Sequence, residues 1–113
     1  MEIMFIELPE FVDKFDKLAT DLEMIELQDE LIENPYKGNL VKGTGGARKI
    51  RMKLQGRGKS SGARVIYYYV DLQGEIWFLD IYSKSIKEDL SESEKKKLYK
   101  FIKEKIHGKF QQI

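Results

Sequence analysis

The chain has no cysteine and only one histidine among its 113 residues. Without cysteine, the sequence indicates neither a disulfide framework nor a cysteine-based metal site. The histidine, His107, lies beside Gly108, where we expect a surface position rather than a catalytic triad or a metal ligand. No apolar run approaches about 18 residues, and no basic segment followed by an apolar one opens the chain. We therefore expect a soluble, cytoplasmic protein without a membrane partner.

Acidic residues are missing from residues 34–70, which hold nine Lys and Arg. Residues 1–33 hold eleven Asp and Glu against two Lys, so the formal net charge of +1 conceals a strong separation of charge. A basic block without acids is suited to contact with phosphates. The alternative is a solvated basic loop that the acidic segment balances. Metal-dependent nucleases need clustered carboxylates, which the block lacks, so we expect no metal and no cofactor.

Two glycine-rich stretches resemble nucleotide-binding motifs but do not meet their requirements. "GRGKS" would need a glycine at the position of Lys53 to form the phosphate-binding loop of NTPases. "GTGG" precedes a predicted strand, whereas the dinucleotide-binding fingerprint opens a helix. Beside so many cations, the glycines would instead let the backbone approach a polyanion.

The amino-terminal third predicts a strand in "MEIMFIEL" and helical structure over residues 10–33, as two short helices or one bent helix. Apolar residues recur at helical spacing, in the second part at Leu22, Ile25 and Leu31. A Thr20–Glu23 capping box and Asn34-Pro35 would bound that part.

The segment "ARKIRMKL" alternates and predicts a strand with two different faces. Its core side would carry Ile50, Met52 and Leu54. Its other side would carry Lys49, Arg51 and Lys53. A hairpin loop, "QGRGKSSG", then leads to "ARVIYYYV", which is apolar on both faces and predicts a central strand.

A further strand, "EIWFLDIY", and an amphipathic helix that begins with a Ser91–Glu94 capping box complete the chain. Short connections between the later strands predict an antiparallel meander. We predict a single α+β domain over residues 1–113, with the helices on one face of the sheet.

The side chains that remain as candidates for catalysis are mainly cations. Without metal or histidine, a nuclease can promote attack of an RNA 2′-hydroxyl on the adjacent phosphate by placing cations where charge develops. Lys and Tyr can serve as base and acid. Lys49 beside Arg51 and Arg64 meets the condition for a lowered lysine pKa, because like charges disfavour the charged form. The alternative is that these residues only bind the phosphate backbone.

The stretches "GTGGARKIR", "GRGKSSGARVIYYYVD" and "FLDIYSK", preceded by "LQDELIENPYKG", resemble the RelE-type toxins of bacterial toxin–antitoxin modules, most closely the HigB-like branch. The resemblance implies a small microbial-RNase-like fold: a curved antiparallel sheet with two amino-terminal helices and one carboxy-terminal helix. It also implies an endoribonuclease that cuts mRNA in the ribosomal A site. The implied partner is an antitoxin with a helix-turn-helix domain, through which alone the operator DNA is bound.

The resemblance places the catalytic cations at Lys49, Arg51, Arg64 and Lys84. Some relatives have a catalytic tyrosine where this chain has Leu90, and Tyr82 is the substitute candidate, with a purely structural role as its alternative. The cations assigned to RNA or ribosome phosphates are Arg48, Lys53, Arg57 and Lys59. Two other functions stay open: a ParE-like toxin that inhibits gyrase, and a non-catalytic RNA-binding module.

Overall fold

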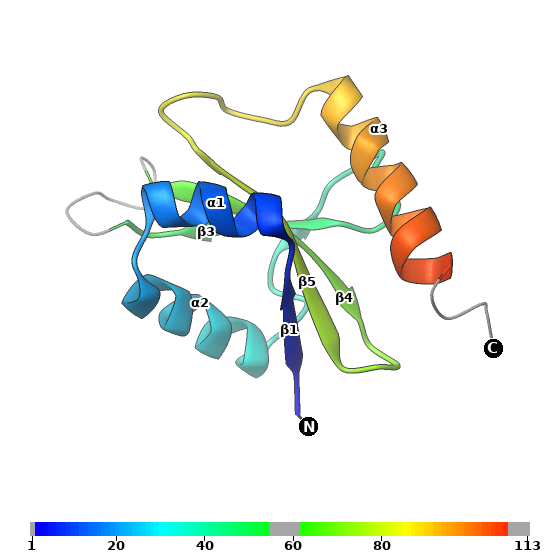
Figure 1. The fold of residues 1–113 in the computed structure, drawn as a ribbon, viewed down its shortest axis with the longest axis horizontal. Helices are drawn as coiled ribbons and strands as arrows, with labels where there is room; N and C mark the ends of the chain where they lie inside the picture. The colour runs from blue at the N-terminus through cyan, green and yellow to red at the C-terminus, as the bar shows by residue number, and fades with distance from the viewer. Residues whose placement is uncertain (1, 55–61, 109–113) are drawn as a thin grey trace.

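The computed structural model describes residues 2–54 and 62–108 (Figure 1). Its elements are β1 (Met4–Glu7), α1 (Pro9–Leu18), α2 (Asp21–Glu33), β2 (Asn39–Leu40), β3 (Arg48–Met52), β4 (Ala63–Val70), β5 (Glu75–Ser83), α3 (Glu92–Phe101) and the π-helical segment η2 (Ile102–His107). Residues 10–33 therefore belong to two helices rather than one bent helix. Within the described ranges, no helix is both long and apolar enough to cross a membrane.

The described strands form one sheet in the order β1-β5-β4-β3-β2. The predicted meander of β3, β4 and β5 is antiparallel, and β4 is the central strand, as expected from its two apolar faces. β1 pairs with β5 in parallel at one edge. β2 pairs with β3 at the other edge over two residues. A strand this short has no recognisable alternation.

Both faces of the sheet are covered, so the prediction that all helices lie on one face is wrong. On one face, Phe11 and Leu31 from the amino-terminal helices pack with Val65 of β4. On the other face, Ile102 and Ile106 from η2 pack with Ile66 of β4. Figure 1 shows α1 and α2 on the opposite side of the sheet from α3. The cause is the composition of β4 and β5: strands that are apolar on both sides need a cover on each.

Side-chain caps define the starts of two helices as predicted. The Thr20 hydroxyl accepts a hydrogen bond from the Glu23 backbone N–H, and the Glu23 carboxylate accepts one from the Thr20 backbone N–H. Ser91 and Glu94 form the same box at the start of α3. Such caps satisfy backbone donors that have no partner within the helix.

The buried face of α2 differs from the predicted one. Met24, Leu27 and Leu31 are buried, whereas Leu22 and Ile25, which helical spacing assigned to the apolar side, are 65% and 52% exposed. Apolar residues occur around most of this helix, so spacing alone did not identify the side that packs on the sheet.

The glycines of "GTGG" have a structural role in the fold, and their expected contact with a polyanion stays a prediction. Gly45 and Gly46 have φ values of 78° and 117°, a region that residues with a Cβ rarely adopt. A Cβ at Gly45 would lie 3.0 Å from the Tyr99 ring, and one at Gly46 would lie 3.0 Å from the Tyr68 ring. These glycines thus let the loop turn tightly against two aromatic side chains.

Candidate functional site

A hollow of about 350 Å³ opens on the sheet beyond the part that α3 covers. Its lining contains four cations that the sequence analysis assigned to catalysis: Lys49, Arg51, Arg64 and Lys84. Asn39, Glu88 and Asp89 complete the lining. We call this the cationic hollow. Its four cations come from three neighbouring strands or their ends, although they span 36 positions of the sequence.

Strand register brings these side chains together. The Cα atoms of Arg51 and Arg64 are paired across β3 and β4. Because side chains alternate along a strand, Lys49 and Arg51 lie on the face opposite Ile50, which is 6% exposed and belongs to the core under α1 and α2. The backbone N–H of Lys84 donates to the Gly62 carbonyl at 3.1 Å, which places Lys84 beside the start of β4.

Arg64 is the most buried of the four cations, with 4% of its surface exposed. Its Nη1 donates to the Ala63 carbonyl at 3.2 Å. Burying a guanidinium is costly unless its donors are satisfied, and a buried Arg also loses the freedom to move. The hollow therefore has one cation whose position the fold determines closely.

Two acids, Glu88 and Asp89, share the hollow, and neither was predicted from the sequence. The Asp89 carboxylate lies 3.4 Å from the Lys49 ammonium. A hydrogen bond from the Leu90 backbone N–H lowers the pKa of Asp89, and the nearby Lys49 acts in the same direction. The sequence feature that could have identified Asp89 was its position directly before Leu90, which the resemblance had already placed near the site.

Tyr82 is not part of the lining of the hollow. It is 6% exposed and packs in the core between the sheet and α3, and Leu90 packs there too. Within the described residues, its hydroxyl is buried and has no hydrogen-bond partner. Burial is the largest cause that raises the pKa of Tyr82 to about 12, and Asp89 adds to the increase. In this structure solvent does not reach the hydroxyl, which favours the structural alternative.

Arg48 and Lys53, two of the four cations predicted to bind phosphates, do not line the cationic hollow. Nη1 of Arg48 donates to the carbonyls of Tyr36 and Gly38, at 3.1 and 2.8 Å, and the guanidinium lies over the Tyr36 ring. Lys53 lines separate hollows beside the acids of α2. Arg57 and Lys59, and all of the predicted hairpin loop except Gly62, lie outside the described residues.

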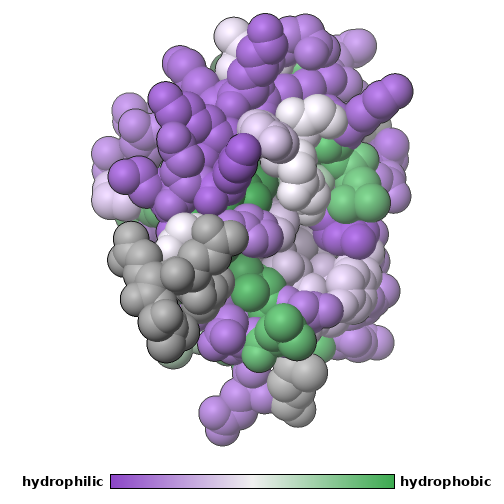
Figure 2. All heavy atoms as spheres, turned by 90° about the vertical axis from the view of Figure 1, so that its right-hand side faces the viewer, coloured by the Kyte–Doolittle hydropathy of each residue, from purple (hydrophilic) through white to green (hydrophobic). Residues whose placement is uncertain are grey.

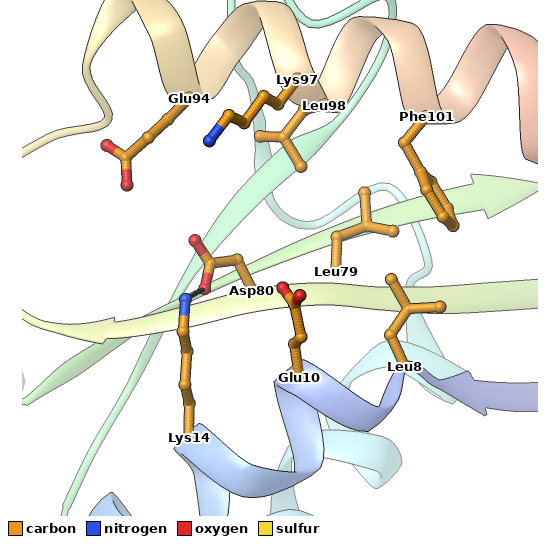
Figure 3. A pocket seen from close by; sticks show the side chains of 9 residues that line it. All are labelled: Leu8, Glu10, Lys14, Leu79, Asp80, Glu94, Lys97, Leu98 and Phe101. Carbon is orange, nitrogen blue, oxygen red and sulfur yellow. Dashed lines mark hydrogen bonds and ion pairs between the residues drawn. The ribbon is translucent and has the colours of Figure 1, made fainter.

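A second hollow, of about 270 Å³, lies between α1 and α3 over β5 (Figure 3). Leu8, Leu79, Leu98 and Phe101 form its apolar part. At the other end, the Lys14 ammonium lies 2.9 Å from the Asp80 carboxylate, a hydrogen bond that raises the pKa of Lys14. Glu10 and Glu94 also border the hollow. This acid content makes it less suited to a polyanion than the cationic hollow.

Two further observations concern the surface near α3 and possible metal ligands. Seen from the side of α3, the surface is mainly hydrophilic, with hydrophobic residues in small separate areas (Figure 2). His107 is exposed, and its Nε2 forms a 2.7 Å hydrogen bond with the Tyr68 hydroxyl. In the part of the chain that the structure describes, no three His, Asp or Glu side chains are grouped to hold a metal ion.

No family model matches the sequence. Its structure is similar to that of a mutant of E. coli toxin RelE in the free state, with a TM-score of 0.56 and 20% identity over 78% of this chain and 90% of that one. The isolated E. coli RelE toxin has a TM-score of 0.56 at 17% identity, over 88% of this chain and 98% of that one. A chain of the intact E. coli RelBE toxin–antitoxin complex has a TM-score of 0.54 at 18% identity, over 70% of this chain and 93% of that one.

These likenesses establish that the chain has the RelE fold. The predicted α+β, RelE-like fold with two amino-terminal helices and one carboxy-terminal helix is confirmed. The described sheet is antiparallel, as predicted, except for the parallel pairing of β1 with β5.

Proposed function

We propose that this protein is the toxin of a type II toxin–antitoxin system, related to the HigB-like branch, and that it cleaves mRNA on the ribosome without a metal ion. The observation that carries the proposal is the convergence of Lys49, Arg51, Arg64 and Lys84 in one hollow of a RelE fold. Four cations in one concave site are well suited to hold a phosphate and to stabilise added negative charge.

The proposed reaction is attack of an RNA 2′-hydroxyl on the adjacent phosphorus. The 2′-oxygen forms a bond to phosphorus as the bond to the 5′-oxygen breaks, which leaves a 2′,3′-cyclic phosphate and a 5′-hydroxyl. One group must take the 2′-hydroxyl proton, and another must give a proton to the departing 5′-oxygen. Both protons are accounted for by a base and an acid, so no external reactant is needed.

We assign the base to Lys49 and charge stabilisation to Arg51 and Arg64. Arg64 is held by the central strand, and its planar guanidinium can donate two parallel hydrogen bonds to phosphate oxygens. Lys84, at the end of β5 on the other side of Arg64, is our candidate for the proton donor. Tyr82 is the reserve candidate for proton transfer, and it would have to become accessible on substrate binding.

The second candidate function is RNA binding without cleavage, which one observation favours. The Lys49 ammonium has a carboxylate partner in Asp89 at 3.4 Å, so in this structure it binds an anion. A Lys49 that acts only as a cation would bind phosphate and would not accept a proton. For cleavage, Lys49 must separate from Asp89 and give up its own proton before it can accept the proton of the 2′-hydroxyl.

The proposed partners follow from this function. The ribosome and its mRNA would meet the cationic hollow, with Arg48, Lys53, Arg57 and Lys59 as further candidates for phosphate contacts. The similar RelBE structure is a toxin–antitoxin complex, which supports a co-expressed antitoxin here. We expect that antitoxin to have a helix-turn-helix domain and to provide the only contact with operator DNA. Action on ribosomes places the protein in the cytoplasm.

The experiment is controlled expression without the antitoxin, followed by mapping of mRNA 5′ ends. We expect growth arrest and cuts within codons of translated messages. The control is the double variant Arg51→Ala, Arg64→Ala, which we expect to be inactive. Equal cleavage of naked RNA would contradict the dependence on ribosomes. Growth arrest with DNA damage and intact mRNA would instead indicate a ParE-like gyrase inhibitor.

A further inference from the structure

The outward side of α2 carries large apolar side chains that are exposed in the described part of the chain. Leu22, Ile25 and Ile32 are 65%, 52% and 49% exposed. The opposite side of α2 already buries Met24 and Leu27 in the core. A helix that needed only to cover the sheet would carry polar residues on its outward side. Covering the sheet therefore does not explain these exposed apolar side chains.

The exposed residues follow the spacing of a helix-packing seam. Leu22, Ile25, Asp29 and Ile32 are separated by three, four and three positions, the a and d pattern of a heptad repeat. Asp29, also exposed, is the polar residue in this seam. The seam runs from Leu22 to Ile32 and is about 15 Å long, and α2 lies at the periphery of the fold (Figure 1).

The positions beside the seam are acidic. Asp21, Glu26 and Glu33 are all exposed and occupy positions of the e and g kind, together with the uncharged Gln28. Lys53 lies at the end of the seam near Leu22, and both residues line the same hollow. The seam is thus a strip of apolar side chains between acids.

The acids beside the seam determine which kind of partner can bind there. A second copy of the chain would set acids of one α2 against acids of the other in both parallel and antiparallel orientations, and like charges there oppose pairing. A nucleic acid or an anionic membrane would also be repelled. An amphipathic helix whose apolar strip is flanked by Lys or Arg would satisfy the exposed apolar surface and the acids together.

We propose that the outward side of α2 docks one cationic amphipathic helix of a partner protein. Leu22, Ile25 and Ile32 contact the apolar strip of that helix, and Glu26 and Glu33 pair with its flanking cations. A cation facing Asp29 would set the register, as polar residues within a seam do. The site is separate from the cationic hollow, so the proposal does not depend on nuclease activity.

The test uses the full-length protein and two synthetic helices of about three heptads, with Leu at the a and d positions except for one Lys at the position that would face Asp29. One carries Lys at e and g, and the other carries Glu. We expect the Lys peptide to bind and the Glu peptide to show no binding in fluorescence anisotropy. The Ile25→Ala variant should bind the Lys peptide at least tenfold more weakly. Leu72→Ala is the matched control, because Leu72 is 91% exposed in the turn after β4 and lies outside the seam.

A charge reversal makes the test sharper. The double variant Glu26→Lys, Glu33→Lys should no longer bind the Lys peptide and should bind the Glu peptide. The thermal midpoint of each variant is measured alongside, and it should stay near that of the parent because the changed side chains are exposed. Equal binding of both peptides, or undiminished binding to Ile25→Ala, would overturn the proposal. So would a stable dimer of the free protein that Ile25→Ala dissociates.

Discussion

Arg51 and Arg64 are directly opposed across β3 and β4, with their Cα atoms paired in register. Two like charges at this spacing destabilise a sheet, and opposite charges or apolar pairs would stabilise it. Arg64 adds the cost of burial, since 4% of its surface is exposed. Departures from favourable pairing are concentrated at functional sites. Both guanidiniums would attract a bound phosphate, which is why we treat the pair as the centre of the site.

The first prediction concerns Arg64 itself. Arg64→Met keeps most of the side-chain volume and removes the charge, so we expect the fold to persist and cleavage to fall by about 10²–10³. Lys100→Met is the control, because it removes an exposed cation of α3 outside the hollow. Cleavage rates and thermal melts on the same preparations give the answer. If Arg64 is structural, the melting temperature falls and the rate per folded molecule is unchanged.

The second prediction separates stability from RNA contact at Arg48. Its guanidinium donates to the carbonyls of Tyr36 and Gly38, which ties β3 to the segment after α2. We expect Arg48→Ala to lower the free energy of unfolding by about 1–2 kcal/mol, as for lost hydrogen bonds to a charged group. Chemical denaturation measures this change. If Arg48→Ala keeps full stability and loses ribosome affinity, Arg48 binds phosphate, as the sequence suggested.

The third prediction concerns pH. Glu94 caps α3 and pairs with Lys87, and these contacts, with Lys87 the largest cause, lower the pKa of Glu94 to about 2. The folded protein therefore binds this proton more weakly than the unfolded chain, for which the pKa is near 4.5. The stabilisation is complete above about pH 4.5 and is lost as the pH falls toward 2.

Glu94→Gln should remove this part of the acid dependence and lower stability at neutral pH. Unfolding free energies from pH 2 to 6 provide the measurement. Glu92→Gln, in the same turn of α3, is the control, since Glu92 is exposed and does not take part in the cap. Parallel curves for the parent and Glu94→Gln would show that the pKa is not lowered in the folded state.

The fourth prediction concerns Tyr82. Its hydroxyl is buried without a partner among the described residues, so its desolvation is not offset. Tyr82→Phe should leave stability unchanged or slightly increased, and cleavage within about twofold of the parent. Denaturation and single-turnover assays test both parts. A large loss of cleavage with normal stability would show that the hydroxyl reaches the substrate after a rearrangement.

Local patterns predicted much of the fold. The alternation around Ile50 identified the buried and exposed sides of β3, and Thr20 and Ser91 marked helix starts, because each of these signals depends on near neighbours in the chain. The placement of α3 was not predicted from periodicity. That information lay in β4 and β5, whose two apolar faces each require a cover.

The site was predictable only where charge stood out from its surroundings. The four cations of the hollow were recognised through the basic block and the family resemblance, and strand register places them together. Asp89 was missed because its contact with Lys49 joins residues 40 positions apart. The outward side of α2 was missed because Leu22 and Ile25 have the spacing of a buried face, and only packing distinguishes the two sides.

The last prediction distinguishes proton transfer from phosphate binding at Lys49. If Lys49 only holds phosphate, Lys49→Arg should be mild, because charge and reach are kept. If Lys49 accepts the 2′-hydroxyl proton, the same change should be severe, because arginine does not give up its proton in proteins. We expect Lys49→Arg to bind ribosomes about as well as the parent and to cut far more slowly. Arg51→Lys should be milder, since we assign Arg51 to charge stabilisation.

The measurement is single-turnover cleavage with saturating ribosome complexes, beside a separate binding assay. Asp89→Asn is the companion variant, because it removes the carboxylate 3.4 Å from Lys49 and leaves the lysine in place. If Lys49 is the base, freeing it from this ion pair should not slow cleavage, whereas Lys49→Arg should remain slow in the Asp89→Asn background. Cleavage by Lys49→Arg at the parental rate would exclude Lys49 as the base and direct the search for proton transfer to Lys84.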